Sequence, residues 1–175
     1  MSLNDEMTGL MDVARNVTQL TDKMSISDLT SYIVGLAPIN YLDNPIDEQT
    51  IETKNGDYGE DLSSAQLEEG TYCLSAQISH SQDFIGLRVN FRGGVAQPLD
   101  SGNSVHDWGF VSLASDWVQP GKANTLVLPF KVTKAGKLDF GVAANPFTGG
   151  EAKVDKMMLN KGNLPLPFTK NKLGG

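Results

Sequence analysis

The sequence has little of what a disulfide-stabilised or nucleic-acid-binding protein requires. Its 175 residues include one cysteine, Cys73, so no disulfide can form within a chain. Cys73 stands in an apolar run, and we expect it to be a small buried hydrophobic side chain. The formal net charge is -7 and no segment forms a dense basic stripe, which argues against nucleic acid as a partner.

Long apolar runs are also missing. No stretch approaches the length of about 20 apolar residues that spans a bilayer, so we expect no membrane insertion. The first residues are acidic and amphipathic, unlike a signal peptide, and we expect synthesis in the cytoplasm without a cleaved signal.

The residues for catalysis are equally scarce. There are two histidines, His80 and His106, and no nucleophile-elbow pattern surrounds either one. Adjacent acids such as Glu60 and Asp61 do not show the separation that a glycosidase needs across the scissile bond. The sequence therefore predicts a protein that is not an enzyme, with two loop histidines whose hydrogen bonds are satisfied.

The first 36 residues have a helical pattern. Helices are expected over 3–20 and 26–34, with Ser25 as the N-cap of the second and Gly35 at its end. The first helix carries a heptad seam, made of Leu3, Met7, Leu10, Ala14 and Val17. A helix this short needs a surface to pack on. That surface is either the second helix or the same helix of other subunits. In the second case residues 1–36 are an oligomerisation segment, and the resemblance described below implies that they also attach the chain.

From residue 37 onward the pattern predicts strands. Residues 37–70 are interpreted as an acidic connection with a first, weak strand at 49–53; the acids are either solvated or bind a cation. Apolar side chains then alternate with polar ones over 72–79, 85–91, 125–132 and 137–142, and further short strands fit 108–114 and 152–159. Pro129 places its strand at an edge or a bulge. The fold class is mainly β: an antiparallel β-sandwich over residues 37–175, most simply a jelly roll.

Several short motifs occur in a familiar order. They are Asn40-Tyr41-Leu42-Asp43-Asn44-Pro45, Gly70-Thr71-Tyr72-Cys73-Leu74-Ser75, Ser115-Asp116-Trp117, Val154 to Leu159, Gly162-Asn163 and Pro167-Phe168-Thr169. Together they resemble the carbohydrate-binding-module-like jelly rolls of bacteriophage tail and baseplate proteins, over about residues 40–170. Residues 14–30 resemble an N-terminal element of structural proteins from phages of lactic acid bacteria.

This resemblance implies a virion protein of a tail, baseplate or head fibre. It implies a homotrimer, joined to other virion proteins through the N-terminal segment, with a domain that binds saccharide of the bacterial cell wall. Jelly rolls of this type often hold a structural calcium ion between the N-terminal loop and the last strand. Asp43, Glu48 and Asp155 would supply its oxygen ligands here.

A saccharide site needs flat aromatic side chains and groups that bond hydroxyls. The candidates beside turns are Trp108, Tyr58 and Phe147 for stacking, with Asp107, Asn103, Asn145, Arg92 and His106 for hydrogen bonds. Burial in the core is the alternative for Trp108, as it is for Trp117. The first hypothesis is thus a saccharide-binding phage adhesion module. The second is a capsid decoration or spacer protein that binds only virion proteins, and the third, weaker one is a glycan hydrolase.

Overall fold

The computed structural model describes residues 38–54, 59–99, 106–107, 112–145 and 148–171, with the backbone alone at 106–107. These residues belong to a compact unit that begins at Pro38. The predicted helices at 3–20 and 26–34, with the heptad seam, lie outside the described residues. The described residues contain no helix, and therefore no helix long and apolar enough to cross a membrane.

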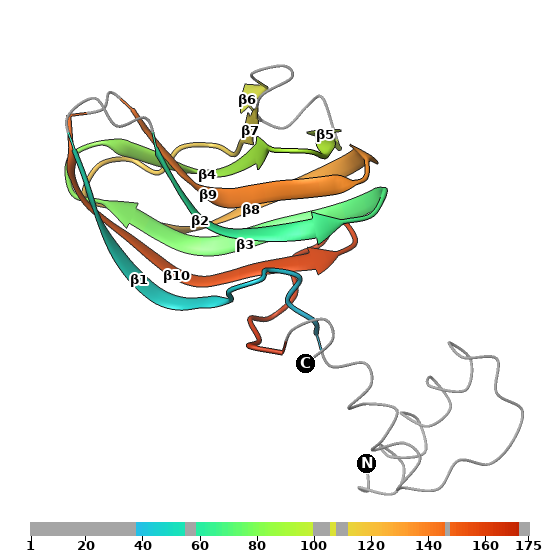
Figure 1. Cartoon of the computed structure of the whole chain (residues 1–175). Coiled ribbons are helices and arrows are strands. Elements are labelled where there is room, and N and C mark those ends of the chain that lie inside the picture. The colour runs from blue at the N-terminus through green and yellow to red at the C-terminus, as the bar shows by residue number, and fades with distance from the viewer. Residues whose placement is uncertain (1–37, 55–58, 100–105, 108–111, 146–147, 172–175) are drawn as a thin grey trace, which may run out of the picture. The chain divides into compact units, whose positions relative to one another are not determined.

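Ten strands make up the described part of the chain (Figure 1). In chain order they are β1 (Ile46–Thr53), β2 (Gly59–Leu67), β3 (Gly70–His80), β4 (Phe84–Phe91), β5 (Val95–Pro98), β6 (His106–Asp107), β7 (Ser112–Ala114), β8 (Ala123–Lys134), β9 (Gly136–Asn145) and β10 (Gly150–Lys161).

The strands form two antiparallel sheets of five. Sheet 1 has the order β1-β10-β3-β8-β5, and sheet 2 has the order β2-β9-β4-β7-β6. Strands β1 to β5 alternate between the sheets, β6 and β7 both belong to sheet 2, and β8 to β10 alternate again. The first and last strands pair with each other through the register Glu48↔Asp155. Neighbours in sequence therefore face each other across the core.

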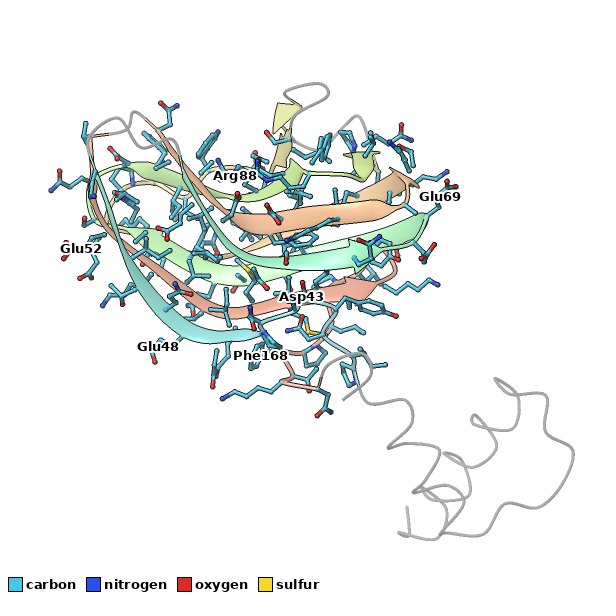
Figure 2. All side chains as sticks on the ribbon, viewed as in Figure 1. Asp43, Glu48, Glu52, Glu69, Arg88 and Phe168 are labelled. Carbon is cyan, nitrogen blue, oxygen red and sulfur yellow. The ribbon has the colours of Figure 1, made fainter. Side chains whose placement is uncertain are left out.

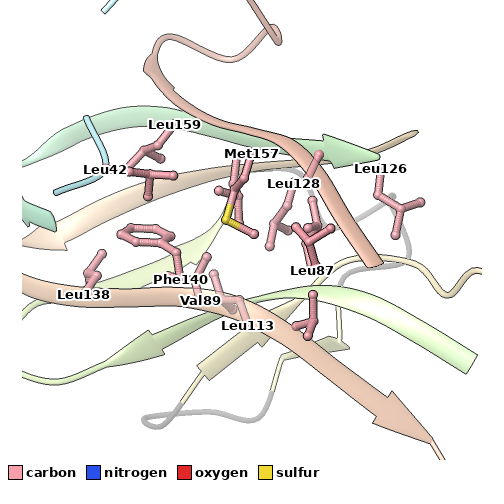
Figure 3. Close-up of a cluster of buried hydrophobic side chains, with 14 of the residues drawn as sticks. Leu42, Leu87, Val89, Leu113, Leu126, Leu128, Leu138, Phe140, Met157 and Leu159 are labelled. Carbon is pink, nitrogen blue, oxygen red and sulfur yellow. The ribbon is translucent and has the colours of Figure 1, made fainter. Parts of the chain in front are cut away.

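The core lies between the two sheets and is made of the apolar side chains at every second strand position (Figure 3). Leu74 of β3 and Leu128 of β8 point inward from sheet 1, while Leu87 of β4 and Phe140 of β9 point inward from sheet 2; all four are fully buried. The Phe130 and Phe140 rings meet across the interior, with centroids 6.2 Å apart. Burying an aliphatic or Phe side chain contributes about 1.5–3 kcal/mol, so these inward rows are the main source of stability.

Most predicted strands are confirmed: β1, β3, β4, β8, β9 and β10 contain the expected runs, and the expected apolar faces join the core. The reading of Pro129 is also confirmed. It lies just beyond Phe130, the residue that pairs with the last residue of β5, so β8 is an edge at this position.

One interpretation is wrong. The connection at 37–70 is not mostly loop, because Gly59–Leu67 form β2, and short strand β5 was also missed. The inward residues of β2 include Ser63 and Ala65, which carry little hydrophobic signal, and a bulge between Asp61 and Ser63 breaks the alternation. A strand whose inward side chains are mostly small, and which has two adjacent acids near its start, is not distinguishable from an acidic linker by periodicity.

After β10 the chain crosses back over sheet 1. The Asn160 side chain fixes this segment, since its amide donates to the Leu164 carbonyl and its oxygen accepts from the Leu166 N–H. The side-chain amide of Asn40 donates to the Thr169 carbonyl (3.2 Å), and the backbone N–H of Asn40 donates to the Asn171 carbonyl (2.8 Å). We call residues 162–171 the C-terminal strap.

Candidate functional site: the polar face of sheet 2

The outward face of sheet 2 carries a row of residues that the strand register aligns. Asp61 of β2 pairs with Gly141 of β9, Gly141 with Arg88 of β4, and Arg88 with Ala114 of β7. Register partners in a sheet share a face, and this face is opposite to the core-facing Leu87 and Val89. We call this outward surface, with the neighbouring Asn90, Arg92 and Asp139, the polar face.

Asp61 is the hub of a hydrogen-bonded network on the polar face. Its Oδ1 accepts from Arg88 Nη2 at 2.9 Å and from Asn90 Nδ2 at 2.7 Å, and its Oδ2 accepts from Arg92 Nη2 at 2.8 Å. Arg92 Nε donates in turn to Asp139 Oδ2 at 2.6 Å. Three strands, β2, β4 and β9, thus contribute to one charge-balanced group.

The floor beneath this network is made of residues with little or no side chain. Arg88 reaches Asp61 across β9, where Gly141 leaves the space open. A Cβ at Gly141 would overlap the Glu60 carbonyl oxygen of β2, and one at Gly59 would overlap that of Val142. Glycine is therefore required for β2 and β9 to approach this closely. The result is a low floor with polar groups over it; Figure 2 shows Arg88 on this sheet.

The charges of the polar face differ in exposure. The Arg88 side chain is only 8% exposed, whereas that of Arg92 is 56% exposed. Hydrogen bonds to Asp139 and then to Asp61 raise the pKa of Arg92 above its ordinary value. Arg88 is therefore a structural anchor, while Arg92 is a fixed, solvent-facing guanidinium. Such an arrangement can hold planar donors and acceptors ready for a polar ligand.

Arg92 is the predicted saccharide residue that the structure places in this network. Asn145 is exposed at the other end of β9, where it pairs with Phe84, so it does not converge with Arg92. The backbone of His106 and Asp107 forms edge strand β6, with His106 in register with Ala114 and so in the row of Arg88. Predicted residues Trp108, Tyr58, Asn103 and Phe147 lie outside the described residues.

The network residues Asp61, Arg88, Asn90 and Asp139 were missed by sequence reasoning. Asp61 lay in the supposed linker, and the others occupy outward strand positions that resemble ordinary solvated residues. The available signal was the set of outward glycines and alanines, such as Gly86, Gly141 and Ala143, around one arginine. An arginine side chain between such small neighbours can lie flat across the sheet, where it pairs with a carboxylate of a neighbouring strand.

The predicted calcium ligands are only partly assembled. Glu48 and Asp155 are register partners on sheet 1, and Asp155 Oδ1 is buried without a hydrogen-bond partner among the described residues. The Asp43 carboxylate accepts instead from Ser64 Oγ at 2.6 Å. The described residues contain no group of three or more His, Cys, Asp or Glu that could hold a metal ion. Two carboxylates alone do not meet the six to eight oxygens of calcium.

His80 lies at the opposite end of β4 from Arg92. Its ring is 1% exposed, and Nδ1 accepts from the Gln82 and Asp83 N–H groups at 3.1 and 2.8 Å. Nε2 therefore carries the proton and donates to Thr53 Oγ1 at 2.9 Å. Burial lowers the pKa of His80 below 6.5, against an opposing effect of Asp83. The expectation of satisfied hydrogen bonds is confirmed, but the expected loop position is wrong, because His80 is the buried last residue of β3.

The comparisons with known proteins give no relative to set beside this geometry. No protein-family model, no curated protein and no solved structure matches the chain.

Proposed function

We propose that the chain is a virion structural protein whose β-sandwich binds saccharide through the polar face of sheet 2, without catalysing a reaction on it. The observation that carries this proposal is the network around Asp61. Its planar guanidinium, amide and carboxylate groups are held in fixed positions by one another, and hydroxyl-rich ligands are bound by such groups. Preorganisation reduces the entropy that binding would otherwise cost.

The strand order supports a jelly roll as the finer description. The sheets β1-β10-β3-β8 and β2-β9-β4-β7 have the order produced when a long antiparallel hairpin is wrapped into two Greek keys, with β5 and β6 as additions at the edges. This is the fold that the resemblance to phage carbohydrate-binding-module-like domains implies.

A binding role suits the polar face better than hydrolysis. Asp61 and Asp139 both accept hydrogen bonds from the Arg92 guanidinium, which bridges them. A glycosidase needs one carboxyl group that can give a proton to the leaving oxygen. Carboxylates joined by a cation are better suited to hold a ligand than to protonate it.

Multiple copies would compensate for weak single sites. We propose that residues 1–36 join the chain into a homotrimer and attach it to other virion proteins, so that several polar faces meet one cell surface. Linked sites raise the effective concentration and hence the avidity. Light scattering tests this: the full chain should be trimeric and a 37–175 truncation monomeric. If the full chain and the truncation have the same number of chains per particle, the assignment of residues 1–36 is refuted.

Retention on purified Gram-positive cell walls tests the saccharide proposal. Arg92→Ala should weaken retention by at least about tenfold, because a hydrogen bond from a charged group contributes about 1.5–3 kcal/mol and each 1.4 kcal/mol is about a factor of ten. Lys122→Ala is the matched control, since it removes the same charge from an exposed turn away from the network. Equal retention of both variants would refute the site. Binding to capsids that lack the protein, with no retention on walls, would favour the decoration or spacer role.

A further inference from the structure

A groove on the opposite side of the sandwich is independent of the polar face. It runs between the outward side chains of sheet 1 and the C-terminal strap, and encloses about 400 Å³. That volume is within the range of about 300–1,000 Å³ that is typical of small-ligand sites. We call it the strap groove. Figure 2 shows Phe168, one of its lining residues, across the sandwich from Arg88.

The floor and the wall of the strap groove differ in chemistry. The floor presents the Ser75 hydroxyl and the Gln77 amide of β3, together with the Thr125 hydroxyl of β8. Gln77 and Thr125 are exposed register partners, so their polar groups lie side by side. The wall is apolar and consists of residues 165–168 of the strap, Pro-Leu-Pro-Phe.

The wall is held in place rather than left loose. Asn160 and Asn40 fix the strap at Leu166 and Thr169, and Lys170 Nζ lies 2.7 Å from Asp47 Oδ2. Lys156, at the end of the groove, pairs with the same Asp47 carboxylate and places its Nζ 5.2 Å from the centroid of the Phe168 ring. An ammonium over an aromatic face is attractive, so Lys156 also orients the ring.

Lys156 occupies this position at a conformational cost. In the β10–β3 ladder, Lys156 and Met157 oppose the single residue Ala76, which is a β-bulge. Lys156 has φ of 55°, the left-handed region that non-glycine residues rarely adopt. Bulges redirect side chains and are common beside functional sites, and such strain persists only where the surroundings impose it.

The groove fits a saccharide better than a peptide. The central strand of its floor is β3, whose backbone is already paired with β10 and β8, so an extended peptide cannot add to β3. The unpaired edge of β8 lies on the side of β8 away from β3. Recognition must come from side chains: neutral hydroxyl and amide groups on one side, and an apolar, partly aromatic wall on the other. A pyranose ring has this same division between its hydroxyl edge and its C–H face.

We infer that the strap groove is a second binding site, for a short neutral saccharide, with Gln77 and Thr125 bonding hydroxyls and Phe168 contacting the C–H face. This inference extends the proposed saccharide-binding function and rests on it. The domain then presents two sites on opposite outer faces, and each copy can engage two saccharide strands.

Nuclear magnetic resonance of the isotope-labelled full chain separates the two sites. The probes are glucose-, galactose- and N-acetylglucosamine-containing disaccharides at millimolar concentration. At least one should shift the Gln77 and Thr125 amide signals in a saturable manner. The double variant Gln77→Ala/Thr125→Val should weaken that binding about tenfold, or about 1.4 kcal/mol, as expected for two neutral hydrogen bonds. Gln97→Ala, an exposed glutamine on β5, is the matched control and should bind normally.

The outcomes distinguish the two proposals. Shifts confined to the Asp61 and Asn90 amides would overturn the strap-groove inference and leave the polar face standing. Shifts confined to the strap groove would support this inference and refute the polar face as the site. Absence of shifts in both sets would overturn both. Strap-groove signals that move with protein concentration alone would show that a second copy occupies the groove, which also overturns the inference.

Discussion

The buried imidazole of His80 joins three separate parts of the chain. It lies at the end of β3, donates to Thr53 at the end of β1, and accepts from the two N–H groups of the turn before β4. Thr53 Oγ1 donates onward to the Gly150 carbonyl at the start of β10, at 3.0 Å. The two ring nitrogens therefore have different tasks, and two substitutions can separate them.

Asparagine and glutamine each keep one of these tasks. In His80→Asn the amide oxygen can replace Nδ1, so the turn keeps its acceptor and only the contact with Thr53 is lost, at about 0.5–1.5 kcal/mol. In His80→Gln the amide nitrogen can replace Nε2, but the N–H groups of Gln82 and Asp83 lose their acceptor. Leaving the buried Asp83 N–H unpaired costs about 1–3 kcal/mol, and the partly buried Gln82 N–H adds a smaller amount. Urea unfolding at one fixed protein concentration measures the difference.

Acidification tests the same assignment in the unaltered chain. Because the folded-state pKa of His80 lies below 6.5, the unfolded chain binds the extra proton, and stability falls as the pH drops from 6.5 through the folded pKa. This loss is at most about 1.4 kcal/mol at about pH 5.5, and it should be absent in His80→Asn. A glutamine variant no less stable than the asparagine variant, or a stability that rises between about pH 7 and 5.5, would refute the assigned tautomer.

Three further predictions concern Gly141, Cys73 and Asp155. Gly141→Ala should lower the free energy of unfolding by at least about 2 kcal/mol, because the new Cβ overlaps the Glu60 carbonyl. Gly93→Ala is the control and should be tolerated, since its Cβ would lie 3.7 Å from the nearest atom. Similar urea midpoints for the two variants would contradict this prediction. Cys73 is fully buried, and burial raises the pKa of its thiol to about 11. A thiol reagent near pH 8 should therefore modify Cys73 only when urea unfolds the chain. Rapid labelling of the folded chain would contradict this and show that the sheet around Cys73 opens. Asp155→Asn should stabilise the metal-free chain by about 0.5 kcal/mol, because it removes a like charge opposite Glu48. If the variant is instead less stable than the unaltered chain only when calcium is added, Glu48 and Asp155 hold the ion.

Periodicity was sufficient for the fold class because one face of most of the long strands is strongly apolar. The inward rows of β3, β4, β8 and β9 are built of leucine, isoleucine, valine and phenylalanine, and each was predicted in the correct phase. Strand β2 was not predicted, since its inward Ser63 and Ala65 are small and its bulge at Asp61 shifts the phase. Sequence alone also does not give the strand order, which depends on contacts between residues more than 100 positions apart, such as Glu48 and Asp155.

The candidate sites were harder to predict than the fold, for a physical reason. The sequence directed attention to loops, where aromatic side chains lie beside turns, and Arg92 alone of those candidates is placed in a described network. The groups that meet on the polar face come from strand interiors: Asp61, Arg88 and Asp139 are separated by 27 and 51 positions in sequence and become neighbours only through the register. Alternation gives the face of each residue but not its cross-strand partner.

The two outer faces can differ in chemistry because the domain has only two layers. Two sheets that share one core use every inward position for packing, so only outward positions remain for binding. On sheet 2 those positions are small or charged, which leaves a low floor under fixed polar groups. On sheet 1 the strap supplies an apolar wall over polar strand residues. Because the core separates the two faces, substitutions on one should change its own ligand contacts without moving the other, and this independence would allow one small sandwich to carry the two proposed sites.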